Sequence, residues 1–506
     1  MNKKFLTQII ASLFFLIVLS LIDVLMSISA ESSLNQEINF AEMNHYIESQ
    51  MNKHGLKGVS LAITEGDQIV YLKGYGTAGE KRPMTPQTPM YIGSQSKSFT
   101  GLAISQLVQA GKIDPSKPVI DYIPDFRIAD QNATRKITIN HLLHHVSGLS
   151  EAGFIAILPD TASKQDLIDA LAEATLTAPI GTKFQYFNVG YDVLAIVIEN
   201  VTGITYDQYI NENIFIPLEM SNSFTDPIVA REHGLSQGYT RFFGFPVPTE
   251  QPHREYEVSA GYIISSAEDL AKYAIALLND GKFKNLEIIN KDGLQMLFKP
   301  VQNYGMGWFI SPDRFFHGGA NETFRAEIDL IPSRKLGIVL LINQGYMVDH
   351  FISGPQVMNG VREIALGKEP QSISSGWSVR TIGSGLLVLV LGLITLQTFN
   401  FLKLSKWKER AKNWSVIKTI WEVAISFIIP TVILVVVFSQ IKGFFGTRFN
   451  WTYQILMMFR SLPDISILMI VGSVPDYVQG FIKLFWAINQ KKRRLVNRQA
   501  HEMEIG

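Results

Sequence analysis

The 506-residue sequence contains no cysteine. This absence excludes disulfide bonds, catalysis by a thiolate and metal sites with cysteine ligands. An excess of charge of either sign is also absent, because 45 lysine and arginine residues balance 45 aspartate and glutamate residues. A chain without net charge has no general attraction for the phosphates of nucleic acids, so we expect no nucleic-acid partner.

Hydrophobic residues are abundant and unevenly distributed. They make up 47% of the chain, which is high for a soluble protein. A chain of this length is also expected to form more than one structural unit. The sequence divides into a leader at residues 1–30, a mixed region at 31–365, a polar linker at 366–380, an apolar region at 381–488 and a basic tail at 489–506.

Residues 1–30 have the organisation of a secretory signal peptide. Two lysines precede an apolar run from Phe5 to Ile22, and small residues at 27–30 offer a cleavage site. The run is also long enough to remain as an uncleaved N-terminal anchor, but Asp23 interrupts it and favours cleavage. In either case the sequence predicts that residues 31–365 are exported.

A serine and a lysine three residues apart begin a predicted helix. Ser94 and Lys97 are followed by apolar residues with the spacing of one helix face, and Gly111 stands where the helix would end. Ser94 and Lys97 would share that face, one turn apart. A serine hydroxyl becomes a nucleophile when a neighbouring base removes its proton, and a lysine can be that base if burial or the start of a helix lowers its pKa.

The Ser-x-x-Lys pattern is not specific by itself. It also occurs at Ser405–Lys408 and Ser415–Lys418, in a basic stretch near the end of the chain. A lone match is typical of a solvated helix surface. The significance of Ser94 therefore depends on the motifs that follow it.

Two further motifs follow in the chain. Tyr186-Phe187-Asn188 lies on a predicted turn before a helix that ends at Gly203, where side chains can face a cleft. His317-Gly318-Gly319-Ala320 precedes two apolar strands at 326–331 and 336–342. Its two glycines allow another backbone to approach closely.

Three histidines lie between these motifs, at positions 141, 144 and 145. Such a group suggests a metal site, but no carboxylate stands beside it at ligand spacing. Helix packing and hydrogen bonds within a loop are the expected roles of these histidines. The sequence predicts no metal and no cofactor.

Ser94-x-x-Lys97, Tyr186-x-Asn188 and His317-Gly318-Gly319 together resemble, in order and context, the serine β-lactamase and penicillin-binding-protein superfamily. The resemblance is to its class C β-lactamase-related branch and covers residues 37–365, with supporting landmarks at 145–149 and 304–308. It implies an α+β fold in which an antiparallel sheet flanked by helices packs on an all-helical lobe, with the site between them. The C-terminal region lies outside the resemblance.

The resemblance implies a catalytic role for three side chains. Ser94 would be the nucleophile that becomes acylated, and Lys97 and Tyr186 would carry its proton. The backbone N–H groups of Ser94 and Ala320 would form an oxyanion hole for the charge that develops on the substrate carbonyl. These parts together constitute an acyl-transfer site.

It also implies which residues bind the substrate. Asn188 would hydrogen-bond the substrate amide. His317, Gly319 and Ala320 would lie on the strand that is usually written Lys-Thr-Gly, along the edge of the cleft.

Three positions depart from the family's pattern. His317 replaces a lysine, as in certain D,D-peptidases and D-aminopeptidases of this branch, which argues against an efficient β-lactamase. With an ordinary pKa it would bind a substrate carboxylate less well as the pH rises from 6 to 8, unless Arg325 supplies a permanent charge. Phe187 replaces a small residue and is expected to narrow the cleft, and Tyr262 replaces a second glycine.

Other elements of the mixed region follow from local patterns. Residues 34–55 have a helical pattern, and a hairpin is expected at 59–72. Residues 231–257 are aromatic and poorly periodic, which indicates a loop or a hairpin insertion. A second helical run is expected from Ser266 to Leu278, and Met347–Ala365 predicts one closing helix.

Three apolar segments of membrane-spanning length follow the linker: Thr381–Leu402, Val423–Ile441 and Ile465–Ile488. The third is weaker, because it contains a proline and two charged residues. Basic residues are concentrated at 403–418 and in the tail, and the positive-inside rule places both in the cytoplasm. The sequence thus predicts a multi-pass protein of the cell membrane, with the lipid bilayer as a partner and residues 31–365 outside the cytoplasm.

The predicted function is that of a membrane-anchored serine hydrolase acting on D-amino-acid-containing peptides or esters of the cell envelope. One alternative is a non-catalytic receptor that binds cell-wall peptides or β-lactams, although the intact set of Ser94, Lys97 and Tyr186 argues against a pure binder. A weak β-lactamase is another. A transporter is disfavoured, because the spans carry no charge pair beyond Asp476 and Lys483.

Overall fold

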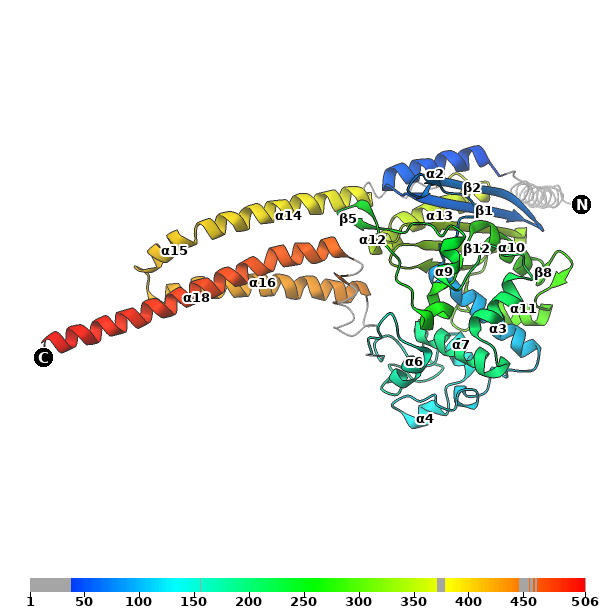
Figure 1. Cartoon of the computed structure of the whole chain (residues 1–506), viewed down its shortest axis with the longest axis horizontal. Helices are drawn as coiled ribbons and strands as arrows, with labels where there is room; N and C mark the ends of the chain where they lie inside the picture. Colours follow the sequence, from blue (N-terminus) through cyan, green and yellow to red (C-terminus); the bar gives the residue numbers. More distant parts are fainter. Residues whose placement is uncertain are drawn as a thin grey trace, which may run out of the picture.

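The structure is a computed structural model that describes residues 38–154, 156–370, 378–445, 455, 458–459 and 462–505. The predicted leader at residues 1–30 and the linker residues 371–377 lie outside the described residues. Figure 1 shows two parts: a mixed body of strands and helices, and a group of long helices that extends from one side of it.

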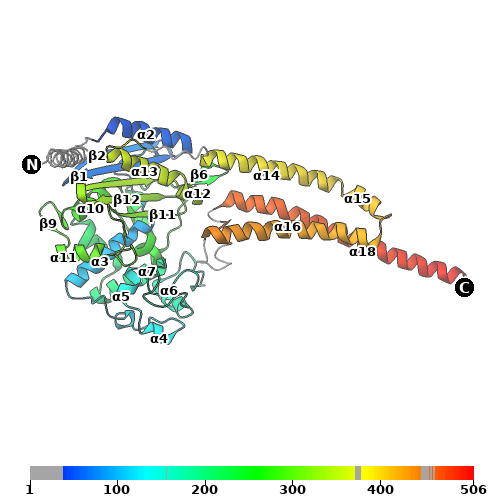
Figure 2. The same cartoon turned by 180° about the vertical axis from the view of Figure 1, so that it is seen from behind.

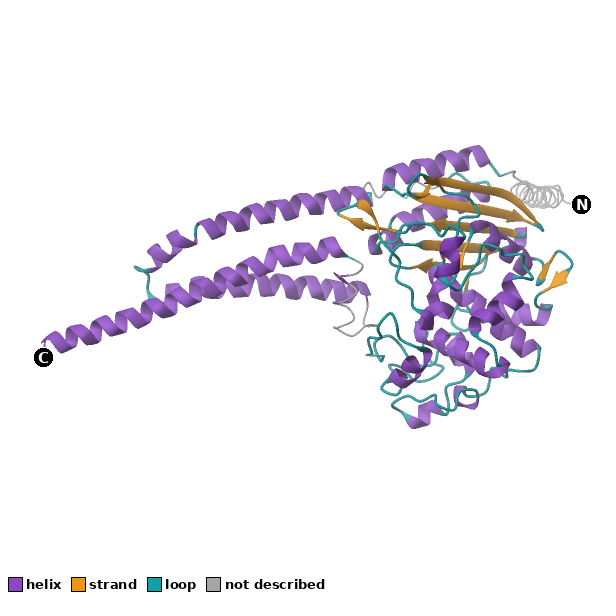
Figure 3. Cartoon of the chain, viewed as in Figure 1, coloured by secondary structure: helices purple, strands orange, loops and turns teal. Residues whose placement is uncertain are grey.

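A seven-stranded antiparallel sheet forms the centre of the body (Figure 3), with the strand order β10-β11-β12-β13-β1-β2-β3. In chain order its strands are β1 (Gly58–Glu65), β2 (Gln68–Gly79), β3 (Arg82–Pro83), β10 (Phe309–Ile310), β11 (Phe315–Ala320), β12 (Arg325–Ile331) and β13 (Leu336–Ile342). The expected hairpin is β1–β2. Because β1 pairs with β13, with Val59 opposite Ile342, the sheet joins the two ends of the body.

Both faces of the sheet are covered, which explains why its middle strand, β13, is apolar throughout. Alternate residues of β1 enter different cores: Leu61 and Ile63 pack with helices α2 (Phe40–His54) and α13 (Ser353–Ala365). Ala62 packs on the opposite face with α10 (Ala267–Leu278). The sheet is therefore the middle layer of three.

The helical lobe lies on the α10 side of the sheet in both views (Figures 1 and 2). Its helices are α3 (Ser96–Gln109), α4 (Gln131–Thr134), α5 (Ile139–Leu143), α6 (Lys164–Leu171), α7 (Asn188–Thr202), α8 (Tyr206–Ile210), α9 (Pro227–Glu232) and α11 (Lys291–Phe298). Three small two-stranded sheets complete the body: β4 (Met90–Tyr91) with β7 (Ile264–Ser265), β5 (Tyr239–Phe242) with β6 (Phe245–Pro248), and β8 (Lys282–Phe283) with β9 (Leu286–Glu287). The predicted α+β fold is confirmed.

Local predictions hold with two corrections. Helix α3 ends before Gly111, whose φ of +68° suits glycine. It is not amphipathic, however, because it is buried from Ser96 to Ser105. The single closing helix is wrong: α12 (Met347–Phe351) and α13 are separate. Pro355 lies in the first turn of α13, where its missing N–H is tolerated, and cannot continue a helix from α12.

The long helices are α14 (Val379–Leu402), α16 (Val416–Phe445) and α18 (Pro463–Ile505), and the short α15 (Leu404–Ala411) lies between the first two. Three segments within the described residues are long and apolar enough to cross a membrane: Val379–Leu402, Val416–Ser439 and Pro463–Lys492. These agree with the predicted spans. The second begins earlier than expected, and α18 continues through the basic tail.

Helices α14, α15, α16 and α18, called the bundle below, contact the body at α12. The Tyr346 hydroxyl donates to both carboxylate oxygens of Asp464, at 2.7 and 2.8 Å. Tyr346 also packs with Val379 at the start of α14 and with Leu462 before α18. Two of the three long helices are thus fixed to the same short segment of the body.

Candidate active site

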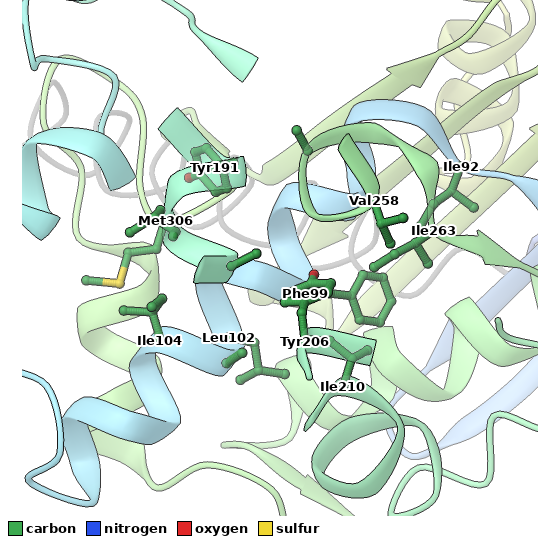
Figure 4. Packing of buried hydrophobic residues seen from close by; sticks show 14 of the residues in the cluster. Ile92, Phe99, Leu102, Ile104, Tyr191, Tyr206, Ile210, Val258, Ile263 and Met306 are labelled. Atoms are coloured by element: carbon green, nitrogen blue, oxygen red, sulfur yellow. The ribbon is translucent and has the colours of Figure 1, made fainter. Parts of the chain in front are cut away.

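Helix α3 is held rigidly by its core. Figure 4 shows Phe99 and Leu102 of this helix among side chains from several other elements. Phe99 stacks on Tyr273 with ring centres 4.4 Å apart. Ser94 lies in a 3-10 turn, Gly93–Gln95, that leads directly into α3. Because the helix is packed on all sides, the spacing between Ser94 and Lys97 is fixed.

Strand β11 lies directly against the Ser94 turn, and two glycines make this possible. A Cβ on Gly319 would lie 1.7 Å from the Ile92 carbonyl oxygen, and a Cβ on Gly93 would lie 2.3 Å from the backbone nitrogen of Ala320. Gly93 also has a φ of +56°. This close approach brings the backbones of Ser94 and Ala320 together, as an oxyanion hole built from their N–H groups requires.

The amine of Lys97 is fully buried, and its three partners are all neutral. Nζ lies 2.8 Å from Asn188 Oδ1, 2.6 Å from the Ala260 carbonyl oxygen and 3.4 Å from Ser94 Oγ. A neutral amine has two N–H donors, which match the two carbonyl-type oxygens. Its lone pair is then left for the hydroxyl proton of Ser94.

Burial favours that neutral form. It lowers the pKa of Lys97 from 10.5 to about 7, and the nearby charges of Asp192, Glu257 and Glu151 prevent a further fall. A base with a pKa near neutrality combines a substantial unprotonated fraction with useful basicity. Lys97 thus meets the condition for a lysine to act as the base, which is a pKa lowered by burial.

Tyr186 lies beside this pair. Its ring centre is 4.8 Å from Lys97 Nζ, and its hydroxyl is buried without a hydrogen bond of good geometry. Burial raises the pKa of the phenol, the Ser94 hydroxyl lowers it, and the charge of Glu151 raises it. The phenol is therefore protonated at neutral pH and able to donate.

The three histidines have separate structural roles. The ring of His145 lies 4.4 Å from that of Tyr186, and its Nδ1 accepts from the Phe187 N–H at 3.2 Å. His141 closes the N-terminal cap of α5 with Thr138. Nδ1 of His144 bonds the Asn140 carbonyl at 3.0 Å. These are the packing and loop roles expected from the sequence.

A cavity of ≈ 320 Å³ opens beside Ser94. Ser94, Asn188 and Ala320 line it, and so do Ala260, Gly261 and Tyr262. Lys97, Tyr186, His317 and Gly319 are not among its lining residues. The structure therefore brings the predicted residues together, with the proton carriers behind the nucleophile.

Glu151 is a residue of the site that the sequence did not reveal. It lines the cavity, and its Oε1 lies 3.3 Å from the backbone nitrogen of Asn188. Burial raises the pKa of its carboxyl to about 7, against a lowering by the Asn188 N–H. Glu151 lies just after the landmark 145–149, but an acidic residue in a loop has no pattern of its own.

Arg254 is a second such residue, and it comes from the insertion at 231–257. It lines the cavity and is surrounded by acids, with Asp160 at 2.7 Å, Glu322 at 3.1 Å and Glu257 at 3.3 Å. It also donates to the Tyr262 hydroxyl. Its charge is therefore already compensated within the protein.

The expected titration of His317 near neutral pH is wrong. Its ring is 2% exposed, and burial, with the charge of Lys97, lowers its pKa to about 3. Nε2 lies 3.1 Å from the Tyr304 hydroxyl, and Nδ1 lies 2.7 Å from the Gly318 carbonyl oxygen. These contacts fit a neutral ring that donates from Nδ1 and accepts at Nε2.

Two further expectations about the cleft are corrected. Phe187 does not narrow it, because the ring is 2% exposed and packs against Phe154. Arg325 does not supply a charge to the cavity, because its guanidinium pairs with Glu327. Tyr262, which replaces the second glycine of the family's pattern, lines the cavity.

The chain is similar to known proteins over the same region. It is 29% identical over 311 residues to Protein flp of Staphylococcus aureus (strain MW2), which covers 60% of this chain and 62% of that protein. It is 29% identical over 314 residues to "Putative penicillin-binding protein PbpX" of Bacillus subtilis (strain 168), covering 61% of this chain and 76% of that one. The chain thus spans less than two thirds of the length of that Protein flp.

A solved structure agrees with the fold. The octameric penicillin-binding protein homologue from Pyrococcus abyssi matches with a TM-score of 0.59 and 27% identity, covering 66% of this chain and 79% of that one. The model of the Beta-lactamase family matches residues 43–359, which hold the sheet, the helical lobe and every residue of the site described above. By this match, the chain belongs to the beta-lactamase family.

Proposed function

We propose that this protein is a membrane-anchored serine hydrolase that forms an acyl-enzyme on Ser94 with D-amino-acid-containing peptides or esters of the cell envelope. One observation carries the proposal. Ser94 Oγ lies 3.4 Å from a buried lysine amine whose two other partners are both hydrogen-bond acceptors. This arrangement supports removal of the serine proton at neutral pH.

The proposed acylation has two steps. Ser94 Oγ bonds to the substrate carbonyl carbon while its proton passes to Lys97 Nζ, and the oxyanion is held by the N–H groups of Ser94 and Ala320. The bond to the leaving amine or alcohol then breaks, and that group takes a proton by way of Lys97 and Tyr186. In the proposed deacylation, water adds to the acyl carbon, the ester bond to Ser94 breaks, and Ser94 takes back a proton as the acid is released.

The lining of the cavity supports a preference for substrates without a free carboxylate. His317 is neutral, and Arg254 is already paired with acids. Glu151, Glu257 and Glu322 all line the cavity. Within the described residues no uncompensated cation lines it, so a carboxylate would meet like charge. Esters and amides are the better-matched acyl donors.

We also propose that the body lies outside the cytoplasm and the C-terminus inside. The three apolar helices and the basic residues at 403–418 and 489–506 support this orientation. A reporter that is active only in the cytoplasm, fused after Gly506, should be active. Activity only of a reporter that requires export would overturn the orientation and leave the chemistry untouched.

Intact-mass spectrometry tests the chemistry. The full chain in detergent is incubated with D-Ala-D-Ala peptides, D-amino-acid amides, esters and β-lactams, and peptide mapping locates any adduct. We expect an adduct on Ser94 with at least one ester or amide, and release of product. The matched control is Ser405→Ala, which removes an exposed serine of another Ser-x-x-Lys pattern and should change nothing.

The alternative function is a receptor, and the contact between Tyr346 and Asp464 favours it. Tyr346 lines the cavity and bonds a residue of α18, so occupancy could be sensed by the bundle. A stable adduct on Ser94 that no substrate of the panel turns over would support the receptor and overturn the hydrolase.

A further inference from the structure

Exposed apolar side chains gather where the body meets the bundle. Phe242, Phe245 and Val247 of the β5–β6 hairpin are 42%, 44% and 39% exposed, and Phe351 at the end of α12 is 60% exposed. In both views these two elements lie beside the start of α14 (Figures 1 and 2). We call these four residues the apolar patch.

The hairpin is fixed to α14. A Cβ on Gly383, in the second turn of α14, would lie 2.1 Å from the backbone nitrogen of Gly244 in the hairpin turn. The guanidinium of Arg380 lies 5.7 Å from the ring centre of Phe245. The patch is therefore level with the first turns of the apolar helix.

The hairpin turn keeps an aromatic residue at a conformational cost. Phe243 and Gly244 form its two-residue loop, with φ values of 51° and +82°. Asn, Asp and Gly are the residues that suit such a turn, and a bulky side chain with positive φ is disfavoured. Phe243 is only 5% exposed, so its ring anchors the turn while its neighbours Phe242 and Phe245 stay exposed.

A second hairpin of the body provides a comparison. The β8–β9 hairpin is also joined by two residues, but charges surround its turn: Lys284 pairs with Glu219 at 2.5 Å, and Lys282 with Glu287 at 3.6 Å. It lies at the end of the body away from the bundle in both views. Of these two hairpins, only the one at α14 has an aromatic residue in its turn.

We propose that the apolar patch inserts into the headgroup region of the lipid bilayer that α14 enters. Continuity with α14 favours lipid over a second protein, because the patch begins at the level where the apolar helix begins. Phenylalanine side chains are typical apolar anchors at that depth, and an arginine near the end of a spanning helix extends its charge to the headgroups. This inference rests on the proposed membrane crossing of α14.

The contact has a consequence for the site. Helix α12 carries Phe351 of the patch and also lines the cavity with Met347 and His350. Insertion of the patch would hold this wall of the cavity at the lipid surface. The substrates it favours are then envelope components that lie close to the membrane.

The absence of cysteine allows a direct test. Single variants Phe245→Cys and Phe351→Cys of the full chain are labelled with an environment-sensitive fluorophore and placed in nanodiscs of phosphatidylcholine and phosphatidylglycerol. Leu286→Cys, on the β8–β9 hairpin and 45% exposed, is the matched control, and Leu389→Cys in α14 reports the membrane crossing. Quenching by lipids that carry a nitroxide near the headgroup, which reports on the patch, and by lipids that carry it deep in the acyl chain, which reports on Leu389→Cys, is then compared, with melting temperature as the check on folding.

We expect quenching at Phe245→Cys and Phe351→Cys to be several-fold greater than at Leu286→Cys. Quenching at Leu389→Cys alone would overturn the proposal and preserve the membrane crossing. A shielded label at Phe245→Cys that lipid nitroxides do not quench would indicate a protein partner and also overturn it. Absence of quenching at Leu389→Cys would overturn the membrane crossing itself.

Discussion

Among the residues that the structure describes, the basic side chains of Arg241 and Lys97 are completely buried, and their surroundings differ. Arg241 on β5 forms a two-point ion pair with Asp349, at 2.6 and 3.0 Å, and donates to the Gly244 carbonyl at 3.0 Å. Lys97 on α3 is equally buried, but its partners are an amide, a backbone carbonyl and a hydroxyl. Arg241 thus has an anion in contact and Lys97 does not.

The difference separates a structural charge from a chemical one. A buried ion pair keeps both members charged, because removing one leaves the other uncompensated. A buried lysine without a contacting anion can give up its proton instead, and its pKa falls to about 7. The predictions below test whether Arg241 contributes mainly to stability and Lys97 mainly to the chemistry.

The largest expected effect is the loss of chemistry in Ser94→Ala. Removing the nucleophile of a unit whose members act together should lower the acylation rate by about 10⁴-fold or more. The Ala side chain fits the half-buried turn, so the melting temperature should stay unchanged. Turnover of the best substrate at a near-normal rate would show that Ser94 is not the nucleophile.

A pair of matched variants compares the buried basic residues Arg241 and Lys97 directly. Arg241→Met should lower the free energy of unfolding by about 3–5 kcal/mol, because it leaves the carboxylate of Asp349 buried and unpaired. Lys97→Met leaves only neutral acceptors unpaired, at a cost of about 1–3 kcal/mol, and should abolish acylation.

Denaturant unfolding in detergent and acyl-adduct formation measure the two quantities. A larger loss of stability in Lys97→Met than in Arg241→Met would contradict the assignment of Arg241 to stability and Lys97 to chemistry. Acylation that persists in Lys97→Met would remove the lysine from the mechanism.

Acylation should also depend on pH through Lys97. The neutral amine is the reactive form, so the rate should rise with pH and reach half its maximum near pH 7, falling about tenfold per pH unit on the acid side. Glu151 raises the pKa of Lys97, so Glu151→Gln should move this midpoint to lower pH. Stopped-flow acylation at a series of pH values measures both; a midpoint that moves to higher pH would contradict the assigned interaction.

The smallest expected effect concerns His317. Between pH 6 and 8 the ratio of the rates for a free carboxylate substrate and for its neutral ester should change by the same factor in the native protein and in His317→Gln, because the ring remains neutral over this range and the titration of Glu151 at the cavity wall is present in both. The titration of Lys97 acts on both substrates and cancels. His317→Gln, which is neutral at every pH, is the control. A ratio that falls more steeply in the native protein than in His317→Gln would show that the histidine titrates.

The sequence predicted the parts of the site that local order determines. Ser94 and Lys97 lie one turn apart, and Tyr186 and Asn188 lie two residues apart, so within each motif the spacing along the chain fixes the spacing in space. Glu151 and Arg254 reach the cavity from loops, and nothing local brings them there.

The surroundings of individual side chains were likewise not predictable from local sequence. The identity of His317 was evident from the sequence, but its neutral state depends on burial by β10 and the Tyr304 ring, from other segments. Phe187 was assigned to the cleft by its position in the motif, whereas its packing against Phe154 decides its place. The fold was predictable because the order of the motifs and the position of the apolar strands resemble those of a family whose fold is known.

The pairing of β1 with β13 also has a consequence for biosynthesis. The β1–β2 hairpin is complete once the chain reaches residue 79, but the partner of its other edge is made only at residues 336–342. At ordinary rates of translation the apolar edge of β1 stays unpaired for on the order of tens of seconds. An open, apolar strand edge invites pairing with other chains, so the risk of misassembly for this protein is concentrated before β13 emerges, and a nascent chain stopped short of it would lack the middle of its sheet.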